Sequence, residues 1–299
     1  MKIAISGSSG QVGSALVSDF RGAGYDVLKL VRRPPESDDE VCWYPEAGHI
    51  DSKSLDGVDA VVHMSGEALA NGRWSVNRKS VIRRSRIHST HVLATALASL
   101  KTAPSVFISA SAMGYYGDRG DELLTETSSS GRGFLAGVAM EWEAAATPAS
   151  ESGIRTVQLR SGLVLSAQGE PLRRLIPLFR LWLGAVFGDG KQYWPWIALE
   201  DVVGATRYAL ENDTLEGPVN TVAPQAVTNA EFTSTLNKAI GRPTIIKLPK
   251  FVVRLLWGEM GTEMLLNSAR MQPRALEATG YKFKYASLED ALRHVLESI

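Results

Sequence analysis

The spacing of apolar residues changes sharply near the start of the chain. Residues 3–5 (Ile-Ala-Ile) form a short continuous apolar run, typical of a buried strand, and Ser6-Gly7 ends it. Apolar residues then recur at helical spacing at Val12, Leu16, Val17 and Phe20. This pattern predicts a strand, a tight turn and a helix, and the rest of the chain is interpreted from that unit.

Strands and helices continue to alternate through the first half of the chain. Apolar runs predict strands at residues 25–31, 41–44, 58–64, 106–108 and 156–159. Helical spacing predicts helices at 76–100 and 134–150. The inward side of the first of these is marked by Val81, Ile87, Val92, Leu93, Ala96 and Leu97. Such alternation predicts an α/β fold with a doubly wound parallel (Rossmann) sheet.

The pattern is less regular after Gly162. Helices are predicted at 171–183, 201–211, 231–240, 251–257, 260–271, 273–279 and 288–296, with a strand at 219–223 and a compact aromatic turn at 194–197. No repeat or low-complexity linker separates the halves, so we expect close packing between them. We predict a dinucleotide-binding domain of residues 1–167 plus 197–224, and a smaller, mostly helical lobe of residues 168–196 plus 225–299.

Three glycines occupy the predicted turn between the first strand and the first helix. Gly7, Gly10 and Gly13 stand where a side chain would obstruct the turn, the approach of a pyrophosphate, and the packing of helix on strand. The N–H groups of the helix start would bind phosphate oxygens. A βα turn without a ligand is the alternative, and a Walker A loop is excluded because no Gly-Lys-Ser/Thr follows. The cofactor-binding residues predicted here are Gly7, Ser9, Gly10, Gln11, Val12 and Gly13.

The end of the second strand decides which nicotinamide cofactor fits. In a dinucleotide fold this position meets the adenosine ribose, and an acidic residue there favours NAD. This chain instead has Val31-Arg32-Arg33, and guanidinium groups suit a 2′-phosphate. We therefore predict NADP(H), with a solvated basic loop as the alternative.

Two later strand ends contribute further candidates. Met64, Ser65 and Gly66 end one strand with small residues that let a cofactor lie against the backbone. Ser109 follows the next strand and should point toward a nicotinamide. His63 lies inside an apolar run, so a hydrogen-bonded core histidine is favoured over a catalytic base.

Composition narrows the class of protein. The 299 residues include 32 Lys and Arg and 32 Asp and Glu, so no overall field attracts nucleic acid or anionic lipid. The single cysteine, Cys42, is compatible with a reducing cytosol, and no signal peptide or membrane span is predicted. The five histidines show no HExxH spacing, so no metal is expected. We expect a cytoplasmic protein with a small-molecule substrate, and a homodimer is left open.

With these motifs in place, the chain resembles the extended short-chain dehydrogenase superfamily of NAD(P)-dependent epimerases and dehydratases. More closely, it resembles the "epimerase family protein" group, which is sometimes labelled cell-division-inhibitor-like and has a C-terminal domain of unknown function. The group's motifs occur at residues 85–90 (S-R-x-x-x-T), 115–117 (Y-Y-G), 142–146 (W-E-A-A-A), 160–165 (R-S-G-x-V-L), 195–197 (P-W-I) and 220–232 (N-x-V-A-P-x-x-x-T-N-x-E-F).

The resemblance implies where an NADP molecule would lie. It places the glycine turn at the phosphates, Arg32 at the 2′-phosphate and Met64 and Ser65 against the cofactor. It also places Arg86 near the cofactor and the backbone around Val164 by the nicotinamide. Arg86 stands where extended members usually have Asn, so a fixed cation replaces a neutral amide.

The catalytic pair of short-chain dehydrogenases is missing. Their Tyr-x-x-x-Lys lies on the helix after the fifth strand, where Lys lowers the pKa of Tyr. Here Phe134 or Leu135 takes the Tyr position, and Val138 or Ala139 takes the Lys position. None of these side chains can carry a proton.

Weak substitutes for the pair are present. Ser111 and Tyr116 follow the fifth strand, but a turn cap and a packed lobe contact are their simpler roles. Glu141 and Glu143 are interpreted as helix-surface charges. Two functions therefore compete: an NADP-dependent oxidoreductase or epimerase acting on an unidentified small molecule, and a protein that binds NADP(H) without turnover as a sensor or partner-binding module.

Overall fold

The centre of the molecule is an eight-stranded sheet in the order β12-β8-β6-β5-β1-β2-β3-β4. A computed structural model describes residues 1–167, 169–243 and 246–298. The strands are β1 (Lys2–Ser6), β2 (Asp26–Val31), β3 (Glu40–Tyr44), β4 (His49–Ile50), β5 (Ala60–His63), β6 (Val106–Ala112), β8 (Arg155–Ser161) and β12 (Gly217–Thr221). Neighbouring strands are parallel throughout, except that β3 and β4 are antiparallel. The predicted doubly wound fold is confirmed, and the strand order reverses between β1 and β5.

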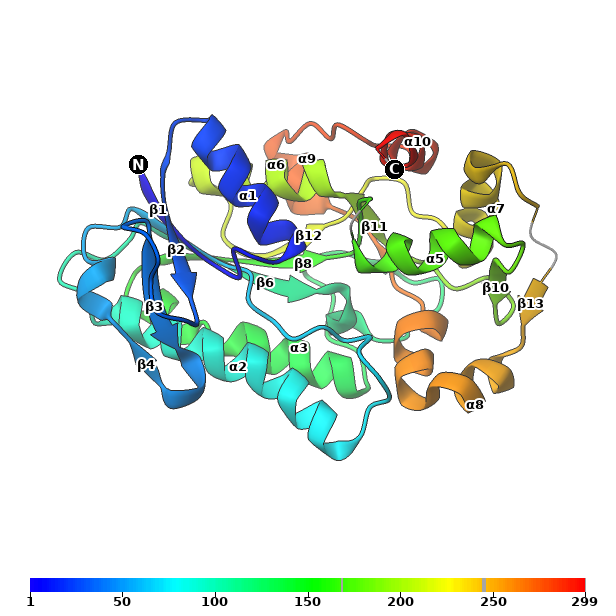
Figure 1. Cartoon of the computed structure of the whole chain (residues 1–299), viewed down its shortest axis with the longest axis horizontal. Helices are drawn as coiled ribbons and strands as arrows, with labels where there is room; N and C mark the ends of the chain where they lie inside the picture. Colours follow the sequence, from blue (N-terminus) through cyan, green and yellow to red (C-terminus); the bar gives the residue numbers. More distant parts are fainter. Residues whose placement is uncertain (168, 244–245, 299) are drawn as a thin grey trace.

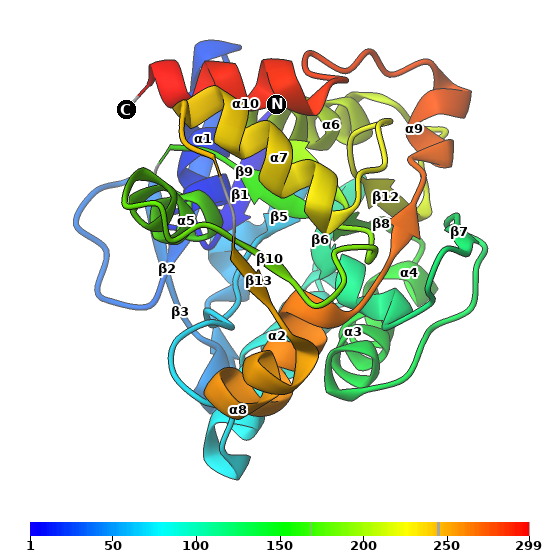
Figure 2. The same ribbon diagram turned by 90° about the vertical axis from the view of Figure 1, so that its right-hand side faces the viewer.

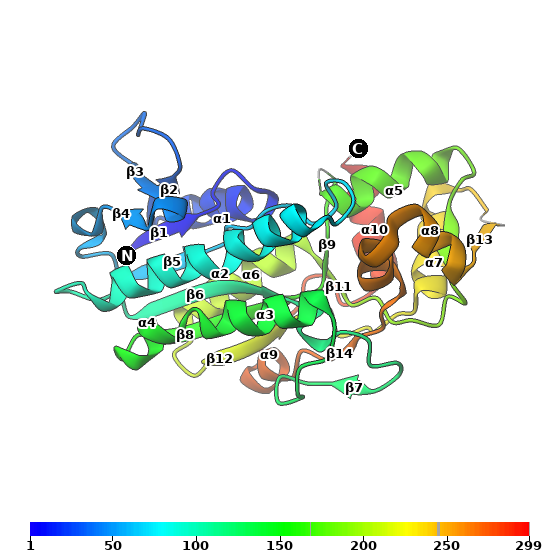
Figure 3. The same ribbon diagram turned by 90° about the horizontal axis from the view of Figure 1, so that it is seen from below.

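Helices cover both faces of this sheet (Figures 1 and 3). One face packs against α1 (Gln11–Gly22), α6 (Leu199–Glu211) and α9 (Arg274–Thr279), with Phe20, Leu210 and Leu276 in one core. The other face packs against α2 (Val76–Ala98), α3 (Phe134–Ala144) and α4 (Thr147–Glu151). Both faces of β1 and β5 are therefore buried, which explains their continuous apolar runs.

A second, mostly helical lobe lies beyond the carboxyl ends of the strands (Figure 2). It contains α5 (Glu170–Arg180), α7 (Asn229–Ile240), α8 (Lys250–Gly261) and α10 (Leu288–Glu297). Two-stranded parallel ribbons join β10 (Ala185–Phe187) to β13 (Ile246–Leu248), β9 (Leu163–Leu165) to β11 (Trp196–Ala198), and β7 (Leu123–Leu124) to β14 (Arg270–Met271). Phe179, Trp194, Phe232 and Leu292 pack into a core that this lobe holds separately from the sheet.

Several predicted elements differ in the structure. The helix predicted at 134–150 is divided into α3 and α4, and Pro148 stands in the first turn of α4, a position that proline favours. The aromatic turn predicted at 194–197 contains the start of strand β11. The helix predicted at 260–271 is replaced by a π-helical turn at Thr262–Leu266 and strand β14.

The predicted inward side of α2 is partly wrong. Val81 is 45% exposed, whereas Ile82, which follows it, is fully buried. Leu93, Ala96 and Leu97 are buried as predicted. Because a long helix with many charges has a weak apolar stripe, an error of one residue is easy at its solvent-rich end.

The predicted division into two domains stays a prediction. One segment predicted to belong to the second lobe packs against the first. Residues 225–299 were assigned to the second lobe, yet Leu276 of α9 packs into the core between the sheet, α1 and α6. The buried Asp201 carboxylate of α6 also accepts hydrogen bonds from the N–H groups of Lys284 and Tyr285, at 2.7 and 2.8 Å. The two lobes are thus joined by buried polar contacts. No helix within the described ranges is long and apolar enough to cross a membrane.

Candidate functional site

The turn between β1 and α1 is built so closely that its glycines are required. Gly7 has φ +70°, and a Cβ there would lie 2.7 Å from the carbonyl carbon of Met64 at the end of β5. A Cβ on Gly13 would lie 2.1 Å from the Gly7 oxygen. The Gly10 N–H donates to that same oxygen at 2.9 Å. The predicted roles of Gly7 in the turn and Gly13 in helix packing follow directly from these distances.

The N-terminus of α1 is open to a ligand. Gly10 is its N-cap, no side chain caps it, and its first turn contains no acidic residue. In α7, by contrast, Thr228 and Glu231 form a capping box. Because the first N–H groups of a helix lack partners within the helix, those of α1 need acceptors from elsewhere. An anion is the acceptor that the helix dipole favours.

A cavity of about 700 Å³ opens beside this turn, at the carboxyl ends of β1, β2 and β5. The predicted cofactor residues that line it are Gly7, Ser9, Gly10, Val31, Arg32, Arg33, Met64, Ser65 and Gly66. The predicted residues that do not line it are Gln11, Val12, Gly13, Arg86, Ser109 and Val164. The cavity thus joins three separate stretches of sequence that were predicted to meet one ligand.

Sequence reasoning missed one wall of the cavity. Trp43 lines it from β3, and five residues line it from α2: Val81, Arg84, Ser85, His88 and Ser89. The five α2 residues recur at helical spacing, which is the signal that could have identified them as one face. Val81 therefore faces the cavity instead of the core.

The two arginines at the end of β2 have different surroundings. The Arg33 guanidinium donates to both Glu40 oxygens, at 2.8 and 3.0 Å, and lies 3.2 Å from Glu36. The pKa of Glu40 is lowered to about 2 because it accepts from the Glu36 N–H, from Arg33 and from Lys29. Arg32 is exposed and makes no hydrogen bond or ion pair with the residues that the structure describes. Of the pair, Arg32 is the one available to a ligand.

Arg86 lies directly under the turn that ends β5. Its guanidinium donates to the carbonyl oxygens of Glu67 and Ile82, at 3.0 and 3.2 Å, and lies 5.2 Å from the centre of the Trp142 ring. A Cβ on Gly66 would lie 3.4 Å from the Arg86 guanidinium carbon. Burial lowers the Arg86 pKa to about 10. No carboxylate in the described chain pairs with this guanidinium, so its charge favours an anion nearby.

His63 is a core histidine, as predicted. It is fully buried, with Nδ1 2.5 Å from the Ser6 hydroxyl and Nε2 3.3 Å from the Ser89 hydroxyl. Burial lowers its pKa from 6.5 to about 3. The imidazole is therefore neutral at physiological pH and joins β1, β5 and α2 behind the cavity.

A buried ion pair links β6, β8 and α3. Arg160 donates through Nε and Nη2 to both Glu143 oxygens, each at 2.8 Å, and the Ser111 hydroxyl donates to Glu143 Oε1 at 2.6 Å. The interpretation of Glu143 as a surface charge is wrong, because its side chain is only 13% exposed. Glu141 does lie at the surface, paired with Arg83. The cause is the direction of α3, which turns Glu143 toward the sheet.

Tyr116 is held within the same cluster. It is fully buried, and its hydroxyl donates to Asn220 Oδ1 at 2.7 Å and accepts from Arg160 Nη1 at 2.9 Å. Burial raises the pKa of this phenol. Both hydrogen-bond partners belong to the sheet, but the Tyr116 ring also packs in one buried cluster with Ala269 and Met271 of the second lobe, which favours the simpler of its two predicted roles.

The positions of the missing Tyr-Lys pair contain no group that can exchange a proton. The Phe134 ring lies 5.2 Å from that of Trp74, and Leu135 packs against Gly114. Val138 and Ala139 are both buried. A carboxylate of the second lobe, that of Glu263, lies beside these positions. It accepts from the N–H groups of Phe134 and Leu135 at 2.6 and 2.7 Å, and so caps α3.

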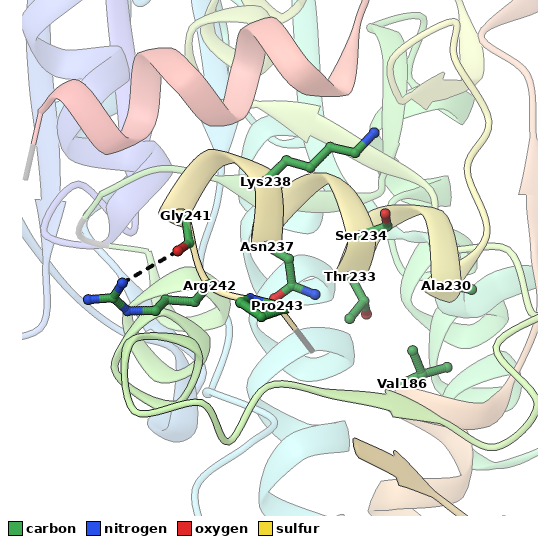
Figure 4. A pocket seen from close by; sticks show the side chains of 9 residues that line it. All are labelled: Val186, Ala230, Thr233, Ser234, Asn237, Lys238, Gly241, Arg242 and Pro243. Carbon is green, nitrogen blue, oxygen red and sulfur yellow. Dashed lines mark hydrogen bonds between the residues drawn. The ribbon is translucent and has the colours of Figure 1, made fainter. Parts of the chain in front are cut away.

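A second cavity, of about 460 Å³, lies in the other lobe beside α7 (Figure 4). Thr233, Asn237 and Pro243 border it on one side and Val186 on the other, and Lys238 and Arg242 also belong to its lining. It has no glycine turn and is not the predicted cofactor site. Among the described residues, no three His, Cys, Asp or Glu side chains are grouped so as to hold a metal ion.

Comparisons with known proteins agree with this geometry. Residues 3–222 match the NAD dependent epimerase/dehydratase family, and residues 248–295 match a domain of unknown function, DUF1731. The chain is 46% identical to the epimerase family protein Mb2239 of Mycobacterium bovis, over 97% of this chain and 96% of that protein.

Two solved structures are similar along nearly the whole chain. The human epimerase family protein SDR39U1 (isoform 2) with NADPH superposes with a TM-score of 0.92 at 32% identity, covering 100% of both chains. The nucleoside-diphosphate sugar epimerase of Corynebacterium glutamicum superposes with a TM-score of 0.83 at 36% identity, covering 99% of this chain and 58% of that one.

Proposed function

Since the chain belongs to the NAD dependent epimerase/dehydratase family, we propose that it binds NADP(H) in the cavity at the ends of β1, β2 and β5. The observation that carries this proposal is that three features meet at one cavity. They are the uncapped N-terminus of α1, the turn in which Gly7 has no room for a Cβ, and the exposed Arg32. The NADPH in the human relative's structure supports it.

Each part of the cavity has a separate task in this proposal. The first N–H groups of α1, with Gly10 at the cap, hold the pyrophosphate. Arg32 binds the 2′-phosphate, while Arg33 stays paired with Glu40 and shapes the loop. Met64, Ser65 and Gly66 line the path of the cofactor, and the buried charge of Arg86 favours the phosphates.

The nicotinamide end supports two candidate functions. When bound, NADP(H) supplies or accepts a hydride. In the first candidate, an oxidoreductase or epimerase of an unidentified small molecule, Ser111 contacts the substrate. Its hydroxyl hydrogen is directed to Glu143, so its lone pairs are left to accept from a substrate hydroxyl.

The second candidate is a protein that binds NADP(H) without turnover, as a sensor or partner-binding module. The observation that favours it is the apolar character of Phe134, Leu135, Val138 and Ala139 where proton-transfer groups are needed. A single cysteine supports a reducing, cytoplasmic location for either function.

Crystals grown with NADPH test the shared part of the proposal. We expect density along the glycine turn, with the 2′-phosphate at Arg32, and an empty cavity or a ligand elsewhere would overturn it. Turnover then separates the candidates. NADPH oxidation with a panel of carbonyl compounds supports the enzyme, whereas a ligand-induced change in oligomeric state without oxidation supports the sensor.

A further inference from the structure

Large apolar side chains are exposed at the outer end of the second lobe. Leu181, Trp182 and Leu183 follow α5 and are 67%, 53% and 53% exposed. Phe251 and Leu255 lie one turn apart on α8 and are 70% and 73% exposed. The β10–β13 ribbon lies between the two groups. Its strands are parallel, so Leu183, which precedes β10, and Phe251, which follows β13, stand beyond opposite ends of the ribbon. Figure 2 shows the end of α5, the ribbon and α8 on the side that faces the viewer.

Positive charge is concentrated in the same segments. Residues 170–191, 238–243 and 246–259, which we call the lobe face, contain nine Lys and Arg but three Asp and Glu, a net charge of +6. The whole chain has a net charge of zero, so the remainder is negative to the same extent. Arg180, Lys247 and Arg254 of the lobe face are exposed. The expectation of no attraction to lipid was based on the total charge of zero. That total conceals an uneven distribution, in which positive charge is concentrated in the lobe face.

One residue of the lobe face, Trp182, combines an exposed aromatic ring with a strained backbone conformation. Trp182 has φ +64°, and among the described residues it is the sole non-glycine with positive φ. Bulky residues rarely adopt this conformation, and such strain often marks functional sites. The Arg242 guanidinium lies 5.4 Å from the Trp182 ring, beside the cavity of Figure 4. A cation and an exposed indole are thus presented together.

Charge decides which partner fits this surface. A second copy docking face to face would bring +6 against +6, which opposes a symmetric dimer here. Nucleic acid would use the cations and stack on aromatic rings, but would leave Leu181 and Leu255 without a role. An anionic lipid surface uses both features, because Trp, Phe and Leu enter the interface while Lys and Arg meet the headgroups.

We propose that the lobe face docks peripherally on anionic lipid surfaces. Trp182, Phe251 and Leu255 enter the headgroup boundary, and Arg180, Lys247 and Arg254 contact lipid phosphates. None of the residues that line the cofactor cavity belongs to the lobe face. The proposal does not depend on the proposed function.

Sedimentation with lipid vesicles tests it, using the full chain. Vesicles of phosphatidylcholine with phosphatidylglycerol should carry the protein down, vesicles of phosphatidylcholine alone should not, and added salt should release it. Phe251→Ser combined with Leu255→Ser should weaken binding at least about tenfold, as should Arg180→Gln, Lys247→Gln and Arg254→Gln combined.

Matched controls keep the test specific. Val76 and Leu123 are exposed apolar residues outside the lobe face, and changing either to Ser should leave vesicle binding unchanged. Thermal unfolding of every variant verifies that it folds. Equal binding to both kinds of vesicle, or binding that neither combined variant weakens, would overturn the proposal. If the wild type does not bind vesicles, and light scattering shows that it is a dimer which the combined variants convert to a monomer, the proposal is overturned in favour of self-association.

Discussion

Acid should destabilise this chain through one buried imidazole, that of His63. In the folded chain its pKa is lowered to about 3 by burial, whereas 6.5 is the ordinary value expected after unfolding. As the pH falls below about 6.5, the unfolded chain therefore binds a proton that the folded chain refuses. The stability contributed by neutral His63 is fully present above that pH, and it is lost progressively as the pH falls toward 3.

The size of the effect follows from the difference in pKa. At about pH 5 the unfolded imidazole is roughly 1.5 pH units below its pKa, which corresponds to about 2 kcal/mol of lost unfolding free energy. His63→Asn removes the titration but keeps a polar group facing Ser6. We expect this variant to have a lower unfolding free energy than the wild type at about pH 8. Between about pH 8 and about pH 5, its unfolding free energy should fall by about 2 kcal/mol less than that of the wild type.

Urea unfolding at both pH values measures these differences. The Trp43 ring packs edge-on against His63 at 5.8 Å, and it is one of seven tryptophans whose combined fluorescence follows the global unfolding transition. His91→Asn, at an exposed position of α2, is the matched control and should keep the wild-type dependence on pH. If the wild type and His63→Asn lose the same free energy between the two pH values, the reasoning from burial is refuted.

The remaining predictions concern α3. Glu143→Ala leaves the Arg160 guanidinium buried and unpaired, so it should lower the unfolding free energy by about 3–5 kcal/mol in urea titrations. Glu141→Ala, which removes a surface charge of the same helix, should cost less than about 1 kcal/mol, and equal losses would contradict the buried pairing. Phe134→Tyr combined with Val138→Lys should raise NADPH oxidation with a suitable carbonyl compound, by up to about 10²–10⁴-fold if the pair is placed correctly. Wild-type turnover at ordinary enzyme rates would show that acid/base chemistry has not been lost.

Local signals in the sequence were sufficient for the first βα unit and for much of the sheet. The role of Gly13 depends on the oxygen of Gly7 in the same turn, and the alternation of strands and helices determines a parallel sheet in which the end of β5 comes to lie against Gly7. The core position of His63 followed from its apolar surroundings. These features are short in range or periodic, which is why a single sequence reveals them.

Features that depend on tertiary contacts were not predictable in this way. Glu143 looks like a surface charge until β8 places Arg160 beneath α3. Arg32 and Arg33 look equivalent until Glu40 binds one of them. Tryptophan is a residue type that is buried on average, and only the fold shows that Trp182 is 53% exposed.

Calorimetric titration of NADPH and NADH into the wild type and Arg32→Glu tests the central claim most directly. A charge-assisted contact to the 2′-phosphate is worth about 1.5–3 kcal/mol, so the wild type should prefer NADPH by about tenfold or more. Arg32→Glu should abolish or reverse that preference, whereas Arg33→Gln should largely keep it. Equal affinities for the two cofactors in both wild type and Arg32→Glu would contradict the account.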